Sequence, residues 1–333
     1  MGNKNKNKPM MNDIEVGVNN CFINASLQTF LHLDDFITDV RSIQIKEDKK
    51  ENMKLIYEFK VLIVKYMKNN YIIDNINPIE IKKILSEENE KYRTNKQNDA
   101  NEFITLFLNE MMKEVKGIGI KNIKKIDSPK YEIEKMAFDK LEINFFQKNQ
   151  SFLTNLFYGR FKKEIICPND HIIKVSFEVY NMIQLPIIDN ERNDKQDKTI
   201  EQFLTKFQEK RFIDGEIECK ECKKKNYSYF SKTTIYNLPF YIILLLNNQD
   251  IRYSEHFTIK VKEFIEREKN NNDIYELVGV IGYYGNYRRG HYFTKCKYNN
   301  EYWIYYYSDK TNKKKTYLEM DRNTDTILFF KKT

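Results

Sequence analysis

The chain has 333 residues, with 56 Lys and Arg against 48 Asp and Glu, so its formal net charge is +8. It contains no apolar run long enough to span a membrane, and its polar first residues are not a secretory signal. The charges are interspersed, which predicts a solvated surface rather than a nucleic-acid-binding patch. Five cysteines are an odd number for a disulfide framework, so we expect reduced thiols in an intracellular protein of the cytoplasm or nucleus.

The first third of the chain predicts helices. Residues 1–13 are rich in Lys and Asn and are expected to form a disordered arm. The apolar residues Ile23, Leu27 and Phe30 follow Cys21 at helical spacing, so a helix should begin near Cys21. Further helices are expected over residues 52–67, over residues 79–85 and from Asp99 onward.

Cys21 is expected at the first turn of its helix. The unpaired N–H groups and the positive end of the helix dipole favour a thiolate there, and the thiolate is the nucleophilic form of cysteine. The alternative is that Cys21 is only a small buried apolar residue.

The helix after residue 99 carries an acidic pair, Asp99 and Glu102, on its first turn. An apolar stripe accounts for its buried face but not for this pair. The two carboxylates either cap the helix or face a cationic partner.

From residue 152 the pattern changes to runs rich in Phe, Tyr, Ile and Val, separated by charged turns. These runs predict strands, with one short helix over residues 199–210. A helical first half followed by a strand-rich second half is typical of the α+β class.

Residues 291–298 and 301–309 are two aromatic-rich runs on either side of Asn299 and Asn300, which predicts a β-hairpin. A turn centred between the two asparagines places His291 opposite Ser308, with Asp309 one residue further on. A histidine beside a hydroxyl or carboxylate has the orientation that a catalytic base needs. The alternative is a structural histidine.

Together, Cys21 and His291 are the pair that a cysteine protease needs: a nucleophile and a base. The backbone N–H groups around Asn20 and Cys21 are suited to stabilise the oxyanion.

Three segments of the chain resemble the motifs of ubiquitin-specific proteases. Residues 16–28, VGVNNCFINASLQ, resemble the cysteine box of that family, and residues 97–103, QNDANEF, resemble its central motif. Residues 282–309, including Gly285, Gly290, His291 and Trp303, resemble the histidine box. The resemblance extends in the correct order from about residue 14 to residue 330.

The resemblance implies a papain-like cysteine protease with fingers, palm and thumb in one domain over residues 14–333. The helical thumb would take about residues 14–150. The fingers, about residues 151–260, would be inserted in the palm that residues 261–333 complete. The implied reaction is hydrolysis of the bond after the C-terminal glycine of ubiquitin, without a catalytic cofactor.

The resemblance also assigns roles within the active site. It implies Cys21 as nucleophile and His291 as base. The third member is Ser308 by alignment, but we expect Asp309, because a carboxylate stabilises imidazolium better than a hydroxyl does. The family's polar residue five positions before the cysteine is Val16 here, so side-chain help to the oxyanion is either missing or comes from Asn19 or Asn20.

Ubiquitin ends in an Arg-rich tail that finishes with two glycines, and such a tail must reach Cys21 through a narrow channel. Asp99 and Glu102 suit its positive charge. Gly285 and Gly290 allow close backbone approach.

A metal site is the next expectation. Cys219 and Cys222 form half of a zinc ribbon. The family carries a second Cys-x-x-Cys pair, but this chain has Cys167 followed by Asp170 and His171. The expected structural zinc ligands are therefore Cys167, His171, Cys219 and Cys222, and the alternative is a decayed site held by packing. Cys296 is assigned no role.

Two other functions remain open. Val16 and Ser308 are compatible with an inactive ubiquitin-binding scaffold that keeps the fold. A protease for another ubiquitin-like modifier is the second alternative.

Overall fold

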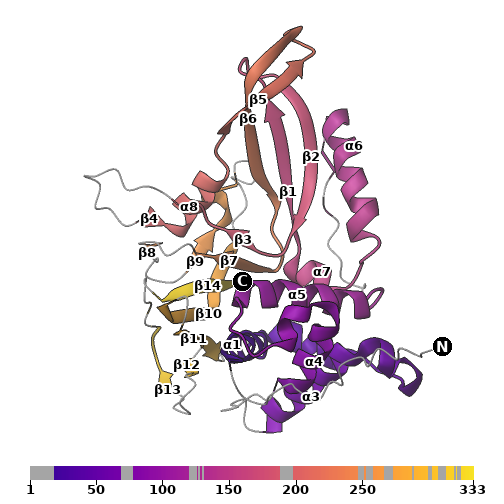
Figure 1. Ribbon diagram of the computed structural model, residues 1–333, viewed down its shortest axis with the longest axis vertical. Helices are drawn as coiled ribbons and strands as arrows, with labels where there is room; N and C mark the ends of the chain where they lie inside the picture. Colours follow the sequence, from indigo (N-terminus) through magenta and orange to yellow (C-terminus); the bar gives the residue numbers. More distant parts are fainter. Residues whose placement is uncertain are drawn as a thin grey trace, which may run out of the picture.

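The computed structural model describes residues 19–68, 78–119, 126, 128–129, 131–187, 198–246, 251–252, 258–265, 273–286, 289–298, 302–306, 313–318, 320 and 324–333. The first half of the described chain is helical and the second half is mostly strands, as the α+β prediction requires (Figure 1).

The five predicted helices are present and start within two residues of the predicted positions, whereas the helix over Asp34–Ser42 was not predicted and the helix over Phe152–Phe157 replaces expected strand. Helix also forms between residues 131 and 146, where the sequence pattern made no prediction. The helices are α1 (Cys21–Phe30), α2 (Asp34–Ser42), α3 (Lys54–Lys68), α4 (Ile79–Glu88), α5 (Ala100–Glu114), α6 (Glu132–Leu141), α7 (Phe152–Phe157) and α8 (Ile200–Phe207). Shorter helical turns are η2 (Glu47–Met53), η3 (Glu90–Arg93), η5 (Glu142–Phe146) and η6 (Val261–Glu263).

Within the described residues the strands form two large sheets and one small parallel pair, β4 with β8. The strands are β1 (Gly159–Ile166), β2 (Ile172–Tyr180), β3 (Ile183–Gln184), β4 (Lys198–Thr199), β5 (Arg211–Cys219), β6 (Lys224–Asn237), β7 (Tyr241–Leu245), β8 (Ile251–Arg252), β9 (Thr258–Lys260), β10 (Ile274–Asn286), β11 (Arg289–Tyr298), β12 (Tyr302–Tyr306), β13 (Lys313–Lys315) and β14 (Asp325–Lys332). The larger sheet has the order β13-β12-β11-β10-β14-β7-β3, with β9 on β10. The other has the order β2-β1-β6-β5 and projects away from the body of the molecule (Figure 1).

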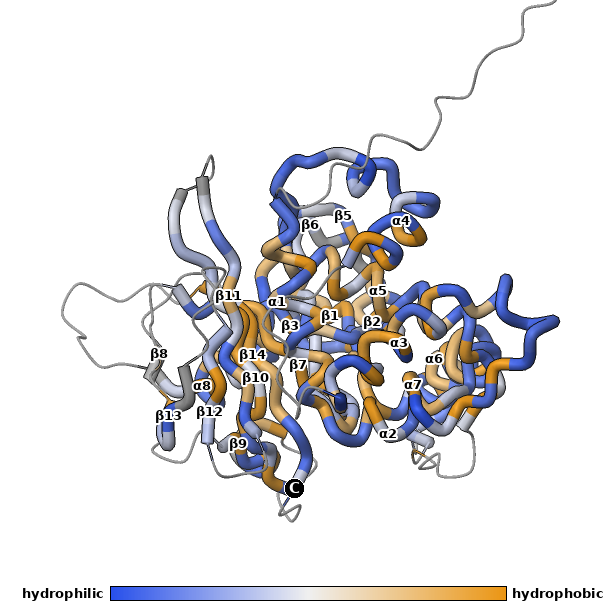
Figure 2. Tube along the Cα trace, turned by 90° about the horizontal axis from the view of Figure 1, so that it is seen from below, coloured by the Kyte–Doolittle hydropathy of each residue, from blue (hydrophilic) through white to orange (hydrophobic). Residues whose placement is uncertain are grey.

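Helix α1 is the centre of the fold. It lies between strands β10 and β11 on one side and helix α5 on the other (Figure 2). Nearly all its residues are buried, so its polar side chains must find partners inside the protein. Ser26 and Thr29 donate back to the carbonyls one turn earlier, at 2.7 and 2.9 Å, and Thr29 also pairs with Thr294 of β11 at 2.8 Å. The bond from Thr29 fixes the C-terminal half of α1 against β11.

The two faces of the larger sheet bury separate apolar clusters. The first cluster contains Phe22, Phe30, Phe107 and other residues of helices α1–α5 and α7, which we call the helical unit. The second cluster lies on the opposite face and includes residues of α8 and η6. Because both faces are covered, the strands of this sheet read as apolar runs rather than as an alternating pattern.

Strands β11 and β12 confirm the predicted hairpin but not its register. Thr294 lies opposite Tyr306 and Tyr298 lies opposite Tyr302, so paired residue numbers sum to 600 rather than 599. The predicted register is therefore wrong by one residue. The reason is that three residues separate the last pair, whereas the prediction assumed a two-residue turn.

None of the helices in the described parts of the chain is both long and apolar enough to cross a membrane.

Candidate active site

Cys21 is the first residue of α1, as predicted, and its side chain is half-buried. Asn20 precedes it at the N-cap position, and Asn19 adopts a left-handed conformation with φ of 60°. Asparagine tolerates this conformation better than most residues, which explains how the chain turns sharply into the helix here.

The donor groups nearest the Cys21 thiol are the backbone N–H groups of Tyr292, Phe22 and Cys21 itself and the side chain of Gln97. These donors lower the pKa of the thiol. Burial nevertheless outweighs them and raises the pKa above its ordinary value. The expectation that the helix start alone favours the thiolate is therefore wrong for the free protein.

Strand β11 carries His291 and passes close to this cysteine. His291 lies opposite Tyr284 of β10, and the two rings are 5.4 Å apart. The backbone of the following residue, Tyr292, lies beside the Cys21 sulfur, so the start of α1 and strand β11 meet here although they are far apart in the sequence.

The loop before α5 closes the site from the other side. The Gln97 side chain donates to the carbonyl of Gly290, and its oxygen accepts from the Gly290 N–H at 3.4 Å. Asp99 occupies the N-cap position of α5, but its side chain makes no capping bond and instead accepts from the Tyr292 hydroxyl at 2.8 Å. This bond answers the question left open for Asp99: its carboxylate joins the helical unit to β11.

The two glycines predicted here face each other across β10 and β11, because Gly285 pairs with Gly290. Gly285 has a φ of 117°, which side chains rarely adopt. A Cβ atom on Gly290 would overlap the ring of Tyr283.

Glu102 forms an ion pair with Lys91 at the surface. Both residues line a hollow of about 540 Å³ between α5 and strands β3 and β7, together with Tyr92, Asn101 and Asn109. The hydroxyl of Tyr92 and the Oδ1 of Asn101 are buried there without a hydrogen-bond partner. These polar atoms suit a polar ligand.

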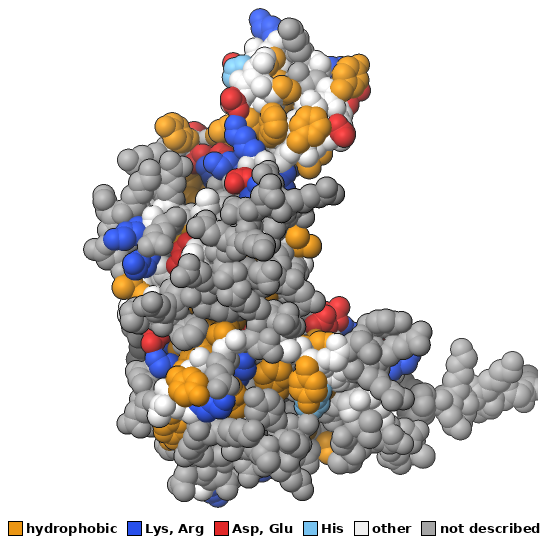
Figure 3. All heavy atoms as spheres, turned by 90° about the vertical axis from the view of Figure 1, so that its left-hand side faces the viewer, with side chains coloured by type: hydrophobic (Ala, Val, Ile, Leu, Met, Phe, Trp, Pro, Cys, Tyr) orange, Lys and Arg blue, Asp and Glu red, His pale blue; other side chains and the backbone are white. Residues whose placement is uncertain are grey.

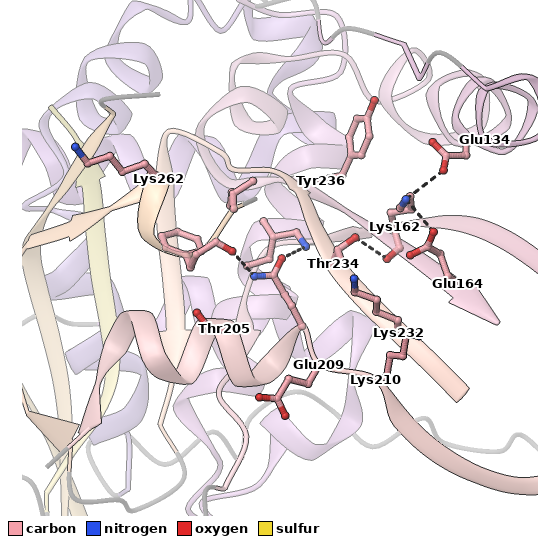
Figure 4. Close-up of a pocket in the computed structure, with 14 residues that line it drawn as sticks. Glu134, Lys162, Glu164, Thr205, Glu209, Lys210, Lys232, Thr234, Tyr236 and Lys262 are labelled. Carbon is pink, nitrogen blue, oxygen red and sulfur yellow. Dashed lines mark hydrogen bonds and ion pairs between the residues drawn. The ribbon is translucent and has the colours of Figure 1, made fainter. Parts of the chain in front are cut away.

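A second hollow, of about 720 Å³, lies at the base of the four-stranded sheet between α6 and α8 (Figure 4). Lys162 reaches both Glu134 and Glu164 in its wall, at 3.2 and 2.9 Å. It contains no predicted site residue, so we do not assign the chemistry to it.

The sequence interpretation missed two residues near Cys21. Gln97 was inside a recognised motif but received no role. Lys82 of α4 also received no role, although its place beside Ile81 and Leu85 in the apolar part of the helix was a signal. Ser308, Asp309, Val16 and Val18 lie outside the described residues.

The four predicted metal ligands converge at the tip of the four-stranded sheet. Their ligand atoms all lie within 4.8 Å of one another. The Sγ of Cys167 is 3.5 Å from Nδ1 of His171 and 3.7 Å from Sγ of Cys222, and Nδ1 of His171 is 3.8 Å from Sγ of Cys219. Tetrahedral zinc with bonds of about 2.3 Å to sulfur and about 2.0 Å to nitrogen would separate its ligands by roughly 3.5–3.8 Å. The donor set and its geometry fit zinc.

Asp170 does not join this cluster. It has a φ of 63°, and its carboxylate pairs with Lys210. The turn from Cys167 to His171 closes with a backbone bond of 2.9 Å from the Cys167 N–H to the His171 carbonyl, which brings His171 to the ligand position instead.

Comparison with known proteins gives one family and one fold. The family model described as ubiquitin carboxyl-terminal hydrolase matches residues 15–330. Ubiquitin carboxyl-terminal hydrolase Usp2 of Drosophila melanogaster is 23% identical over 298 residues, which cover 84% of this chain and 30% of that protein. Ubiquitin carboxyl-terminal hydrolase 9 of Saccharomyces cerevisiae is 24% identical over 280 residues, covering 78% and 34%. The chain thus spans about a third of the length of these curated relatives.

Solved structures show the same fold. A chain of the SAGA DUB module Ubp8/Sgf11/Sus1/Sgf73 bound to monoubiquitin superimposes with a TM-score of 0.69 at 18% identity, covering 96% of this chain and 69% of that one. The module bound to ubiquitin aldehyde gives 0.64 at 17% identity, covering 96% and 70%. The expected papain-like α+β fold is confirmed.

Proposed function

Because the chain belongs to the ubiquitin carboxyl-terminal hydrolase family, we propose that it is a thiol-dependent deubiquitinase. The observation that supports the proposal is the proximity of the Cys21 sulfur to the backbone of Tyr292, the residue that follows the predicted base. The reaction is hydrolysis of the isopeptide or peptide bond after the C-terminal glycine of ubiquitin.

In the proposed mechanism His291 takes the proton of the Cys21 thiol, and the sulfur attacks the carbonyl carbon of the terminal glycine. The resulting oxyanion collapses, the bond to the leaving amine breaks, and His291 gives its proton to that amine. Water, activated by His291, then hydrolyses the thioester and releases ubiquitin. Since burial raises the pKa of Cys21, the proton transfer to His291 is the step that makes the thiolate.

We assign Asp309 as the residue that orients His291. The chemistry supports this choice, because a carboxylate stabilises imidazolium better than a hydroxyl does. Asp309→Ala should reduce kcat on the order of a thousandfold, and Ser308→Ala should reduce it far less. The opposite order of effects would show that Ser308 has this role.

The ubiquitin tail is proposed to pass Asp99, Glu102, Gly285 and Gly290 on its way to Cys21. The molecule is hollowed between the four-stranded sheet and the helical unit, and we place the folded part of ubiquitin in this concavity (Figure 3). Glu102 pairs with Lys91 in the free protein, so an arginine of the tail must displace that lysine.

A ubiquitin probe with a C-terminal electrophile tests the proposal. It should label the wild-type chain under reducing conditions and fail to label Cys21→Ala. Release of a fluorophore from the ubiquitin C-terminus should be abolished in both Cys21→Ala and His291→Ala. Binding of ubiquitin without labelling or turnover would instead support the inactive scaffold, and labelling only by probes for other modifiers would support a different substrate.

We also propose one structural zinc ion held by Cys167, His171, Cys219 and Cys222. The purified protein should contain about one zinc per chain, and Cys222→Ser should lose it together with thermal stability. Asp170→Ala is the matched control and should retain the metal, because its carboxylate pairs with Lys210. Absence of zinc from protein purified without chelators would contradict the assignment.

A further inference from the structure

Lys82 is a buried cation behind the catalytic cysteine. It lies on α4 and is 2% exposed. Its Nζ donates to the side-chain oxygen of Asn20 at 3.0 Å and to that of Asn95 at 3.5 Å. Within the described part of the chain no carboxylate pairs with it. A buried charge without a counter-ion costs stability, so the contribution of Lys82 to folding does not explain its place in the core.

The contact with Lys82 fixes the orientation of the Asn20 amide. A lysine side chain donates hydrogen bonds and accepts none when charged, so the amide oxygen of Asn20 must face it. The NH₂ group of Asn20 therefore points to the other side of the planar amide. The Asn20 side chain does not cap α1, and its NH₂ group bonds to no described residue.

Asn19, the other candidate donor, is already engaged. Its Nδ2 donates to the Asn95 carbonyl at 2.7 Å. Asn95 therefore contacts Asn19 directly through its backbone carbonyl, and it is linked to Asn20 through Lys82, which also donates to the Asn95 side chain. Of the two neighbours of Cys21 that the sequence left open, only Asn20 has an NH₂ group with both N–H donors unused among the described residues, whereas Asn19 is tied to Asn95.

We propose that Lys82 is a positioning residue that holds the Asn20 NH₂ group as a donor to the oxyanion formed at Cys21. The inference rests on the proposed function. An oxyanion needs donors that are aimed before the charge develops, and a locked amide meets this requirement without any proton transfer. It also supplies a side-chain donor in a chain that has the apolar Val16 five residues before the cysteine.

The variant Lys82→Met removes the donor while keeping a side chain of similar length. We expect kcat for a fluorogenic ubiquitin substrate to fall by about tenfold to a hundredfold with little change in KM, because the lost interaction exists only in the transition state. The melting temperature should stay the same or rise, since an unpaired buried charge is gone. Lys83→Met is the matched control: it is the next residue on α4, and its amine pairs with Glu80 at the surface.

The variant Asn20→Asp keeps the contact with Lys82 but removes the N–H donor to the oxyanion. Its carboxylate still faces Lys82, and gains a charge partner there, but it has no N–H to give. We expect a loss of kcat on the order of a hundredfold, with no loss of stability. If Lys82 and Asn20 had only a structural role, the variant would be equally stable but would keep full activity.

Two ubiquitin probes give a readout specific to the oxyanion. A C-terminal aldehyde forms a tetrahedral adduct whose oxygen occupies the oxyanion site, whereas a vinyl sulfone alkylates the thiolate without forming one. Lys82→Met should weaken the aldehyde by the same factor as kcat and leave the rate of vinyl sulfone labelling near that of the wild type. Equal losses with both probes, or wild-type behaviour with both, would overturn the inference.

The two proposals fail differently. If the wild-type chain reacts with neither probe and releases no fluorophore, the deubiquitinase function fails and the role of Lys82 fails with it. If the wild type is active and Lys82→Met matches it in kcat and aldehyde affinity, only the role of Lys82 is wrong.

Discussion

His32 should make the stability of this protein depend on pH between 5 and 7. The ring is buried at the C-terminal end of α1, where its Nδ1 is 2.8 Å from the Gln28 carbonyl and its Nε2 is 3.0 Å from the Tyr306 hydroxyl. A carbonyl accepts only, so Nδ1 carries the proton and Nε2 accepts from Tyr306 in the neutral ring. Burial lowers the pKa of His32 from 6.5 to about 4.

The sign of the effect follows from this shift. The unfolded chain binds a proton at His32 below pH 6.5, but the folded chain does so only below about pH 4. The stabilising contribution of the neutral ring is therefore complete above pH 6.5 and is lost as the pH falls toward 4. With these two pKa values the loss is about 2 kcal/mol at pH 5 and about 3 kcal/mol at pH 4.

The assay is urea unfolding of the wild type and of His32→Gln at pH 7.5 and pH 5. Glutamine does not titrate, so the contributions of other groups cancel in the comparison. Between the two pH values the wild type should lose about 2 kcal/mol more than the variant. Parallel pH dependences of the two proteins would refute the burial of a neutral imidazole.

Three further predictions concern the core and the active-site edge. Asp325→Ala removes the carboxylate that pairs with the buried Lys295 at 2.8 Å, so the free energy of unfolding should fall by about 3–5 kcal/mol, and adding Lys295→Met should restore much of it. Phe30→Ala removes a fully buried ring that contacts four other phenylalanines and should cost about 3–5 kcal/mol in denaturant unfolding, whereas a cost under about 1 kcal/mol would mean that the core collapses to fill the space. Gly290→Ala pushes against Tyr283 and should lower the rate of ubiquitin hydrolysis at least about tenfold; wild-type rates would show that Tyr283 moves aside freely.

Local patterns were sufficient for much of the fold. The apolar spacing after Cys21 placed α1 correctly at its first residue, and the acidic first turn after Asp99 marked the start of α5. These elements are set by side chains three and four residues apart, which a sequence displays directly. Residues 131–146 lack such apolar spacing, and the sequence did not predict helix α6 or turn η5.

The hairpin shows where local information ends. Two aromatic runs separated by Asn299 and Asn300 identify a pair of strands, but every residue of such runs is compatible with either register. The pairing is decided by which side chains of β11 pack on α1, and Thr294 does so through Thr29. The register observed between Thr294 and Tyr306 therefore differs by one residue from the one that the sequence predicted.

By itself, then, the sequence determined the class of fold and the four side chains that converge as a candidate metal site, because each depends on the type and spacing of nearby residues. Only the tertiary structure decided the electrostatics around Cys21. A helix start favours a thiolate, yet burial raises the pKa of this thiol, and a lysine on an ordinary helix becomes an unpaired cation behind it. Desolvation is set by everything that packs around a group, and that packing joins segments of the chain that no local pattern connects.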